Sequence, residues 1–296
     1  MTDSGGTTGE IRDKYGVLPP GDIRRAIAAL ARDTGLVRQL FEYKFKDEVG
    51  VIGGNKIGNI LLTALAHIKG SFEAGLDEAC KMFDVVGKVI PVTLEDVHLK
   101  AIFDDGTEVI GEKFIDVSDK NDCATHNINQ NIKKLSLHGG EGKLNPRALD
   151  VIMHSDVIVI GPGDFYTSVV PALLSKGMQE ALAKTPAKIV FIANIMTKKG
   201  ETTTYELDNF IENIEHYAGK VIDYILVNNG NISDELVEKY RQEEGKKPVK
   251  VKNGADYTAR RFKIVERDFV NESDVVRHDP KKLAAALIDI CRGWIK

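Results

Sequence analysis

Four short stretches of this 296-residue sequence combine glycine with hydroxyl, amide or carboxyl side chains. The first, residues 3–9, reads DSGGTTG. Its glycines let backbone N–H groups approach phosphate oxygens closely, and its threonine hydroxyls add further donors. The carboxylate of Asp3 is suited to a sugar hydroxyl or to a divalent cation. A flexible glycine-rich terminus explains the same composition equally well, because a lone Gly-rich loop is a weak signal.

The second stretch, residues 161–168, reads GPGDFYTS and lies between a predicted strand and a predicted helix. An anion commonly meets a helix N-terminus at such a junction. Thr167 and Ser168 can donate hydrogen bonds to phosphate, and the ring of Tyr166 can stack on a base or a sugar. The alternative is a tight turn in which Asp164 only caps the helix. The position between strand and helix favours a binding role.

The third and fourth stretches are residues 193–197 (ANIMT) and 53–59 (GGNKIGN). The amide of Asn194 follows a strand and offers a paired donor and acceptor that can read a base edge or a carbonyl. The polar residues 198–204 that follow fit a solvated loop as well as a lid. A glycine turn with an asparagine cap explains part of the fourth stretch.

Several common chemistries are missing from the sequence. It has no Ser–His or Cys–His pairing at a readable spacing, no GxGxxG and no GxxxxGK[ST]. None of the four stretches contains histidine, so no catalytic residue is assigned. The carboxylates Asp3, Asp22 and Asp164 fit metal-assisted phosphoryl or nucleotidyl transfer. They fit recognition of a nucleotide sugar equally well, and the residues alone do not choose between the two.

Composition narrows the class of protein. The net charge of −4 argues against a nucleic-acid partner, because phosphate binding requires concentrated Lys and Arg. The three cysteines (Cys80, Cys123 and Cys291) are odd in number and widely spaced, which indicates reduced thiols in the cytoplasm. No apolar run is long enough for a membrane span, and the first residues are not a signal peptide. We expect a cytoplasmic protein.

The elements that position the four stretches follow from hydrophobic periodicity. Apolar β-branched runs at 156–160, 188–195 and 221–227 alternate with helical patterns, which predicts a parallel sheet covered on both faces. We therefore expect a doubly wound, mostly parallel, Rossmann-like α/β fold with a small β-hairpin. Ligands of such sheets bind beyond the carboxyl ends of the strands.

The remaining elements are predicted from the same patterns. Alternating residues on both sides of Asp104–Gly106 predict a hairpin over 97–117. The chain is read as one domain, 1–296, with the hairpin and a polar loop inserted at 92–146. Further strands are predicted at 132–137, 249–251 and 262–269. Helices are predicted at 22–45 (N-cap Asp22), 57–68, 72–83, from 164 to about 183, 205–216, 233–243 and from Pro280 (N-cap Asp279).

Together these motifs resemble a known family. The run DSGGTTGEIRDKYGVLPPGDIRRAIAALA is similar to the DDGGSSGRLR…LPPGDIR stretch of the bacterial YvcK-like gluconeogenesis factors. These share a superfamily with the 2-phospho-L-lactate transferases (CofD). Gly58–Asn59, IGPGDFYTSVVPALL, ANIMTKKGETTTY and RHDPKKLA extend the resemblance over essentially the whole chain.

The sequence departs from the family pattern in three places. An Asp–Asp pair of the family stands here as Thr2–Asp3, and a G-H-S-L-G-N pattern stands as residues 54–59, GNKIGN. The family also begins with a buried strand and a GGGTG phosphate loop that would precede Met1. We expect a chain without this first βα unit to close over the gap, to form a homodimer across it, or to lose stability, and to bind its ligand less tightly.

The resemblance implies a regulatory protein that binds a UDP-sugar such as UDP-N-acetylglucosamine and influences cell-wall synthesis and cell shape during growth on gluconeogenic carbon. By position, Gly5, Gly6, Thr7, Thr8, Thr167 and Ser168 would hold phosphates. Asp3, Asn59 and Asn194 would read the sugar or the base, and Arg12 and Arg24 would supply charge. The predicted ligand site also takes in Asp22, Gly161, Gly163, Asp164, Tyr166, Met196 and Thr197.

Two other readings stay open. The first is an enzyme that moves a phospholactyl group from a guanosine diphosphate adduct to a deazaflavin, with Mg²⁺ bound by carboxylates such as Asp3. The PPGDIR motif at 19–24 favours the regulatory branch, because the transferase branch differs there. The second is a ligand-free remnant that serves only as a protein-interaction surface.

Overall fold

The structure is a computed structural model, and it describes residues 18, 21–32, 34–46, 53–116, 126–251, 257, 259–272 and 275–293. The chain divides into two compact units. Unit 1 takes in the described residues of Met1–Lys100, Ile110–Lys113 and Leu137–Ala148, and unit 2 those of Ala101–Val109, Phe114–Ser136 and Leu149–Lys296. The prediction of a single domain, 1–296, with an insertion at 92–146 stays a prediction.

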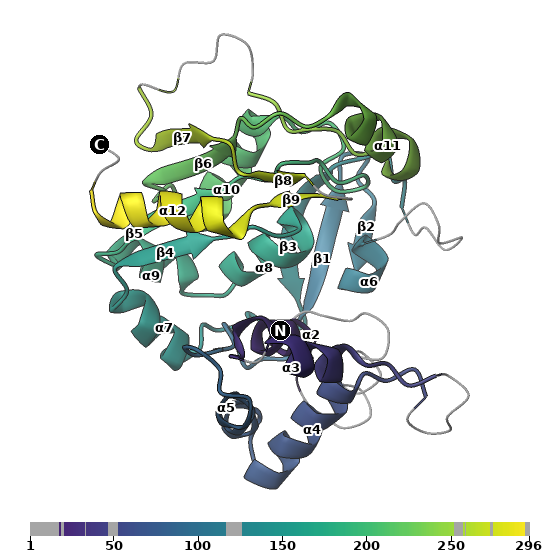
Figure 1. Cartoon of the computed structure of the whole chain (residues 1–296), viewed down its shortest axis with the longest axis vertical. Helices are drawn as coiled ribbons and strands as arrows, with labels where there is room; N and C mark the ends of the chain where they lie inside the picture. Colours follow the sequence, from purple (N-terminus) through teal and green to yellow (C-terminus); the bar gives the residue numbers. More distant parts are fainter. Residues whose placement is uncertain are drawn as a thin grey trace. The chain divides into compact units, whose positions relative to one another are not determined.

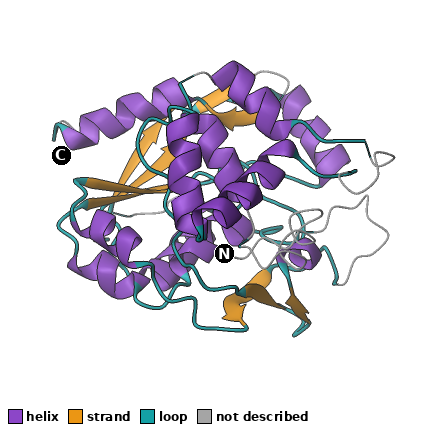
Figure 2. Cartoon of the chain, turned by 90° about the horizontal axis from the view of Figure 1, so that it is seen from below, coloured by secondary structure: helices purple, strands orange, loops and turns teal. Residues whose placement is uncertain are grey.

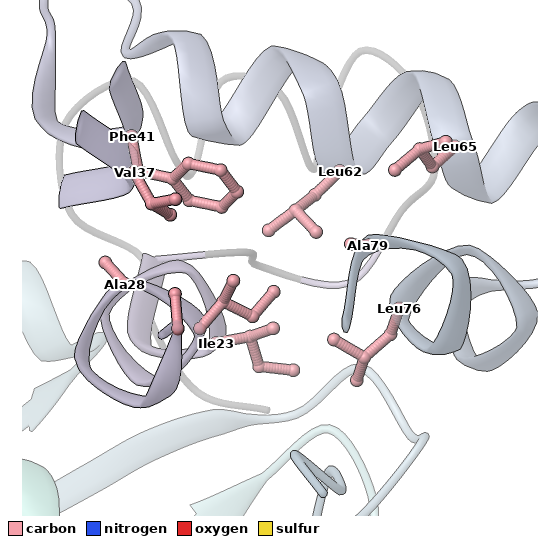
Figure 3. Packing of buried hydrophobic residues seen from close by; sticks show 10 residues of the cluster. Ile23, Ala28, Val37, Phe41, Leu62, Leu65, Leu76 and Ala79 are labelled. Atoms are coloured by element: carbon pink, nitrogen blue, oxygen red, sulfur yellow. The ribbon is translucent and has the colours of Figure 1, made fainter. Parts of the chain in front are cut away.

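Unit 1 is built on four helices: α2 (Gly21–Leu30), α3 (Thr34–Glu42), α4 (Ile57–Lys69) and α5 (Phe72–Met82). Each has apolar residues at helical spacing, so each presents one apolar stripe. These stripes meet in a single cluster in which the side chains point toward one another (Figure 3). Phe41 and Ile27 are fully buried in this cluster, and the ring of Phe41 meets Phe83 edge to face, with centroids 4.7 Å apart.

The expected single helix at 22–45 is wrong. The chain forms α2 and α3 instead, because the backbone between them pairs with another segment. Ala31 forms an antiparallel bridge with Val85, and the carbonyl of Leu30 accepts from Val86 N at 2.8 Å. Asp22 is also not the N-cap, since α2 begins at Gly21 and Asp22 lies in its first turn. Its Oδ1 lies 3.0 Å from Arg25 Nη2.

Three strands, β1 (His98–Phe103), β2 (Glu108–Ile110) and β3 (Ile132–His138), form a sheet in the order β2-β1-β3. The predicted hairpin is confirmed around Asp104–Gly106, where Phe103 N donates to Thr107 O at 2.9 Å. Its second strand is shorter than expected, because α6 (Glu112–Ile115) begins two residues after Ile110.

Unit 2 contains the main sheet, formed by β4 (Val157–Ile160), β5 (Lys188–Ile192), β6 (Tyr224–Asn228) and β7 (Lys263–Arg267). These strands lie in sequence order, and every neighbouring pair is parallel. A parallel order requires a crossover between successive strands, and helices supply these crossovers. The predicted parallel α/β fold is confirmed.

The helices and small strands around this sheet are as follows: α7 (Pro146–Met153), the π-helix η2 (Phe165–Val169), α8 (Val170–Leu173), α9 (Met178–Lys184), α10 (Leu207–Ala218), α11 (Asp234–Glu244), α12 (Pro280–Cys291), and the antiparallel pair β8 (Val270–Glu272) and β9 (Val276–His278). Asp279 caps α12 as predicted, accepting from Lys281 N and Lys282 N. The single helix expected up to about residue 183 is interrupted after Leu173, and α9 starts at Met178 after the left-handed Gly177.

Helices cover both faces of the main sheet (Figures 1 and 2). On one face α12 packs Leu283, Ala286 and Ile290 against Val190 and its neighbours on β6 and β7. On the other face the ring of Phe165 lies 6.3 Å from Phe191 on β5 and 5.1 Å from Phe210 on α10, measured between centroids. The side chains of Val190 and Phe191 point to opposite faces, as the period of two in a strand requires.

Gly75 sets how closely α4 and α5 approach in unit 1. A Cβ at this position would lie 2.5 Å from the backbone N of Ala66 and 2.6 Å from its Cα. Backbone atoms cannot move aside as a flexible side chain can. We predict that Gly75→Ala lowers the free energy of unfolding by about 3 kcal/mol, the upper end of overpacking costs. Denaturant unfolding of this variant, with Lys81→Ala on the exposed side of α5 as control, measures the effect. Equal stability of the two variants would show that the helices separate without cost.

Candidate functional site

The loops that follow β4 and β5 are tied together at the carboxyl end of the main sheet. Asn194, two residues after β5, donates from Nδ2 to the carbonyl of Gly163 at 2.8 Å. Its Oδ1 is buried and has no hydrogen-bond partner in the described part of the chain. An unmatched buried amide oxygen is unusual in a folded protein and calls for an explanation, such as a ligand that supplies the missing donor.

The glycines of the first loop are required by close packing. Gly161 has φ +83°, and a Cβ there would stand 3.3 Å from Ile192 O on the neighbouring strand. A Cβ on Gly163 would lie 3.3 Å from Ser168 Cβ. The turn therefore runs close to both β5 and η2, which explains why two glycines flank Pro162.

The two hydroxyl residues of this loop lie in different environments. Ser168 is exposed, whereas Thr167 is buried and its Oγ1 has no hydrogen-bond partner among the described residues. Two backbone N–H groups of η2 are used within the turn, since Ser168 N and Val169 N both donate to Asp164 O, at 2.9 and 3.0 Å. The unmatched hydroxyl of Thr167 is a group left over for a ligand.

Tyr166 lies in the core and not at the loop surface. Its side chain is fully buried, and its hydroxyl lies 2.6 Å from the Tyr205 hydroxyl and 3.0 Å from Asn213 Oδ1. Burial raises the pKa of Tyr166, and it raises that of Tyr205 to about 12, so both remain neutral phenols. In this structure Tyr166 is a packing residue, and its predicted stacking on a base or sugar has no exposed ring to use.

Met196 and Thr197 hold a second segment against the loop after β5. Met196 forms an antiparallel bridge with Pro248. Thr197 N donates to Lys247 O at 2.8 Å, and Lys247 N donates to Thr197 Oγ1 at 3.1 Å. The two predicted residues thus place the segment 247–251 beside Asn194. A strand was expected at 249–251. The structure instead has an isolated bridge one residue earlier, between Met196 and Pro248.

A pocket of about 840 Å³ opens between these segments and the end of β6. This volume lies within the range of small-molecule sites. Its polar lining is rich in amides, and it is completed by two lysines and two carboxylates: Asn194, Asn228, Asn229, Asn231, Lys247, Lys250, Glu206 and Asp234. Neither Lys247 nor Lys250 forms an ion pair with any residue the structure describes. Of the predicted site residues, Asn194 lines this pocket.

Beside the Gly163 loop, three carboxylates share one ammonium. Lys198 Nζ lies 2.7 Å from Asp116 Oδ1, 2.9 Å from Asp164 Oδ2 and 2.8 Å from Glu201 Oε1. Glu201 is almost fully buried, with 1% of its side chain exposed, and its Oε2 has no partner among the described residues. We call these four residues the Lys198 cluster. It joins the segment after α6, the loop after β4 and the loop after β5.

The charges of the cluster explain its protonation. Burial is the largest cause that raises the pKa of Glu201, and repulsion from Asp164 and Asp116 raises it further. Attraction to Lys198 lowers it only in part, so the pKa of Glu201 is about 7. Burial opposes the charge of Lys198, but its three carboxylates together raise its pKa well above the ordinary value. Lys198 therefore stays charged, and Glu201 is the member that titrates near neutral pH.

The sequence alone does not identify Asp116, Lys198 and Glu201 as site residues. It predicts a solvated loop or a lid at 198–204. The available signal was a Lys–Glu pair three residues apart directly after a strand, beside a loop already containing Asp164. Asp116 gave no signal, because only the fold brings it to Lys198.

Three of the predicted ligand-site residues that the structure describes belong to unit 1. The guanidinium of Arg24 is buried, and it pairs with Glu42 and donates to Phe41 O at 3.3 Å. Glu42 also pairs with Lys56 at 2.6 Å, so the Arg24 charge is used within the helices. Asn59 is buried on α4, and Asp22 is exposed on α2.

The remaining predicted residues lie outside the described ones: Asp3, Gly5, Gly6, Thr7, Thr8 and Arg12. The Mg²⁺ prediction rests on Asp3. Among the residues that the structure describes, no group of three or more His, Cys, Asp or Glu could hold a metal ion. The carboxylates of the Lys198 cluster already surround an ammonium. No described helix is long and apolar enough to cross a bilayer.

Comparison with known proteins places this geometry in a family. The model of the 2-phospho-L-lactate transferase CofD family matches residues 1–270. This chain belongs to the CofD family. A crystal structure of a UPF0052-family protein from Bacillus halodurans superposes with a TM-score of 0.85 at 35% identity, covering 97% of this chain and 88% of the other.

Within the CofD family, the chain resembles gluconeogenesis factors. It is 35% identical over 299 residues to the gluconeogenesis factor of Bacillus subtilis, covering 99% of this chain and 89% of that protein. The gluconeogenesis factor of Halalkalibacterium halodurans is 34% identical over 294 residues, with 98% and 86% covered. A relative from Clostridium acetobutylicum is 35% identical over 291 residues, and the chain spans 62% of its length. The recognition of a YvcK-like member of this superfamily is confirmed.

The buried carboxyl of Glu201 gives a pH dependence of stability. Between pH 4.5 and about 7 the folded chain keeps a proton on Glu201 that the unfolded chain releases, so the free energy of unfolding falls as pH rises through this window. The shift corresponds to about 3 kcal/mol at 1.36 kcal/mol per unit. We predict that Glu201→Gln, which stays neutral, removes this loss. Denaturant midpoints at pH 5 and pH 8 measure it, with exposed Glu180→Gln on α9 as control. The same pH dependence in wild type and Glu201→Gln would contradict the prediction.

Proposed function

We propose that this chain binds a nucleotide sugar, specifically a UDP-sugar, at the carboxyl edge of the β4–β7 sheet and acts through binding as a regulatory protein. The observation that carries the proposal is Asn194. Its side chain fixes the Gly163 loop, lines the 840 Å³ pocket and keeps a buried oxygen without a partner. A ligand donor at this oxygen would satisfy it, and the amide group of a nucleobase is such a donor.

The lining of the pocket supports a ligand with a base and a diphosphate. Asn229 and Asn231 bring paired amide donors and acceptors that suit the edge of a base, and Asn194 adds its unmatched Oδ1. The amide of Asn228 is already bonded to Gly230 and Phe269. Lys247 and Lys250 are positive charges without an ion pair among the described residues, and they suit phosphate oxygens. Glu206 and Asp234 keep the pocket from being strongly basic, which disfavours long polyanions such as nucleic acid.

The biological setting of the proposal comes from the relatives. Proteins 34–35% identical over nearly the whole chain bear the name gluconeogenesis factor. We propose that the chain acts in growth on gluconeogenic carbon, with an influence on cell-wall synthesis and cell shape, as its resemblance to the YvcK-like branch implies.

The family model favours one other function. Its description as a 2-phospho-L-lactate transferase makes transfer of a phospholactyl group to a deazaflavin the alternative. A deazaflavin-linked fluorescence assay with a guanosine diphosphate adduct and Mg²⁺ tests it directly. Turnover in this assay would replace the regulatory proposal.

Thermal unfolding with UDP-glucose, UDP-N-acetylglucosamine, UDP, GDP, GTP and NAD tests the binding proposal. A ligand at a hundred times its dissociation constant adds about 2.7 kcal/mol to the free energy of unfolding. We expect a clear rise of the melting temperature with the UDP-sugars and none with NAD. A shift with guanine nucleotides alone would favour the transferase.

Thr167 provides a variant that separates binding from stability. Its buried Oγ1 has no partner in the described chain, and an unmatched buried hydroxyl costs about 1–3 kcal/mol. We predict that Thr167→Val leaves the ligand-free protein equally or more stable but weakens UDP-glucose binding about tenfold, measured by calorimetric titration.

Thr93→Val is the matched control. Its buried Oγ1 accepts from Glu95 N at 3.2 Å, so this substitution should lower stability and leave the dissociation constant unchanged. Unchanged affinity in Thr167→Val together with lowered stability would show that Thr167 has only a packing role.

A further inference from the structure

The Lys198 cluster carries an excess of negative charge next to the proposed ligand pocket. One ammonium faces three carboxylates, so the formal charge is −2 with Glu201 ionised and −1 with Glu201 protonated. Nζ of Lys198 lies within 2.9 Å of one oxygen of each carboxylate and donates a hydrogen bond to Asp164 Oδ2. Its positive charge is therefore already surrounded by carboxylates, which oppose the approach of another anion.

The cluster adjoins the pocket through two short connections. Asp164 directly follows Gly163, whose carbonyl accepts the amide of the pocket residue Asn194. Lys198 is four residues after Asn194, which spans at most about 14 Å of extended chain. The backbone of Lys198 therefore lies no more than about 14 Å from that of the pocket residue Asn194, which puts the cluster within reach of a ligand that extends past Asn194.

The two outer carboxylates are free to accept further hydrogen bonds. Asp116 and Asp164 are 43% and 53% exposed, and each uses one oxygen for Lys198. Their second oxygens have no other partner among the residues described. An ionised carboxylate is an acceptor only, and its hydrogen bonds from hydroxyl groups are strong because it is charged.

These observations suit a neutral polyol and oppose an anion. Sugar hydroxyls can donate to Asp116 and Asp164, while a carboxylate at the same place meets like charges and an ammonium that three carboxylates already surround. Two like charges about 4 Å apart near a protein surface repel by several kcal/mol before screening. When it is ionised, Glu201 adds to this negative charge, and salt screens it little because it is buried.

We propose that Asp116 and Asp164, held in place by Lys198, receive the sugar of the bound nucleotide sugar and select neutral hexoses against uronic acids. The inference rests on the proposed function, because it concerns the sugar end of the same ligand. It assigns Lys198 as the positioning residue that holds the two carboxylates against their mutual repulsion.

UDP-glucose and UDP-glucuronate form the decisive pair, since they differ only at C6, where a hydroxymethyl group stands in place of a carboxylate. Calorimetric titration of the full chain with both, and with UDP as the sugar-free reference, measures the contribution of the sugar. We expect UDP-glucuronate to bind at least about tenfold more weakly than UDP-glucose, with a smaller difference at high salt.

Asp164→Asn and Asp116→Asn identify the source of the selectivity. Each removes one negative charge and keeps the size of the side chain. We expect each to weaken UDP-glucose several-fold, to leave UDP unweakened and to narrow the gap between UDP-glucose and UDP-glucuronate. Glu180→Gln on α9, the same charge change at an exposed site, should alter none of the three affinities. Two variants on different segments keep the test valid if one of them fails to unfold cooperatively.

The outcomes distinguish a failure of sugar selection by Asp116 and Asp164 from a failure of UDP-sugar binding as a whole. Equal binding of UDP-glucose and UDP-glucuronate overturns the inference and leaves the proposed function intact. Loss of UDP affinity in Asp164→Asn equal to the loss for UDP-glucose also overturns it, because the carboxylate would then act on the nucleotide. Absence of binding by all three ligands overturns both proposals.

Discussion

The parallel order of β4, β5, β6 and β7 is the constraint on which the site depends. Each strand runs in the same direction as its neighbour, so the residues that follow the strands meet at one edge. Gly163 and Asn194 come into contact for this reason, although they are 31 residues apart. The end of β6 adds Asn228 to the same edge. An antiparallel arrangement of the same strands would send alternate loops to opposite ends.

A second constraint is the single positive charge of Lys198. Three segments supply one carboxylate each, and the shared ammonium is what allows them to lie together. Removing it would leave the like charges of Asp116 and Asp164 without their shared partner and would drive the buried Glu201 further toward its protonated form. The cluster is therefore both a structural clasp between loops and the source of a local negative field. Its position beside Asn194 makes that field relevant to any ligand in the pocket.

Much of the fold follows from periodicity in the sequence. The runs at 188–195 and 221–227 contain strands that are largely buried because helices cover both faces, and such strands are continuous apolar stretches that are easy to recognise. The run at 156–160 has the same apolar composition, although β4 is an edge strand and Val159 is exposed. The break between α2 and α3 could not be predicted in this way, because it depends on backbone pairing of Ala31 with Val85, a contact across 54 residues. Neither could the place of Asp116, since a solvent-facing aspartate in a loop has no periodicity to reveal its partner.

Within the candidate site, the sequence singled out two loops that the structure brings into contact, but it did not reveal the environment of single side chains. Tyr166 and Thr167 are neighbours in a stretch read as ligand-binding, yet the structure treats them differently. The hydroxyl of Tyr166 is matched by Tyr205 and Asn213, as expected of a core residue. Thr167 Oγ1, Asn194 Oδ1 and Glu201 Oε2 are buried and unmatched among the described residues.

A chain that satisfies the Tyr166 hydroxyl completely and leaves three nearby polar atoms unsatisfied has not simply packed poorly. Each unmatched atom costs about 1–3 kcal/mol, and an apolar residue of the same shape would avoid that cost. The three atoms belong to η2 and to the loop after β5, and Asn194 lines a pocket with two lysines that form no ion pair with any described residue. A bound ligand that hydrogen-bonds to these atoms would offset that cost, whereas a ligand without matching groups would not. The unmatched atoms would therefore favour the matching ligand over others. This is the physical reason to place the ligand at this edge.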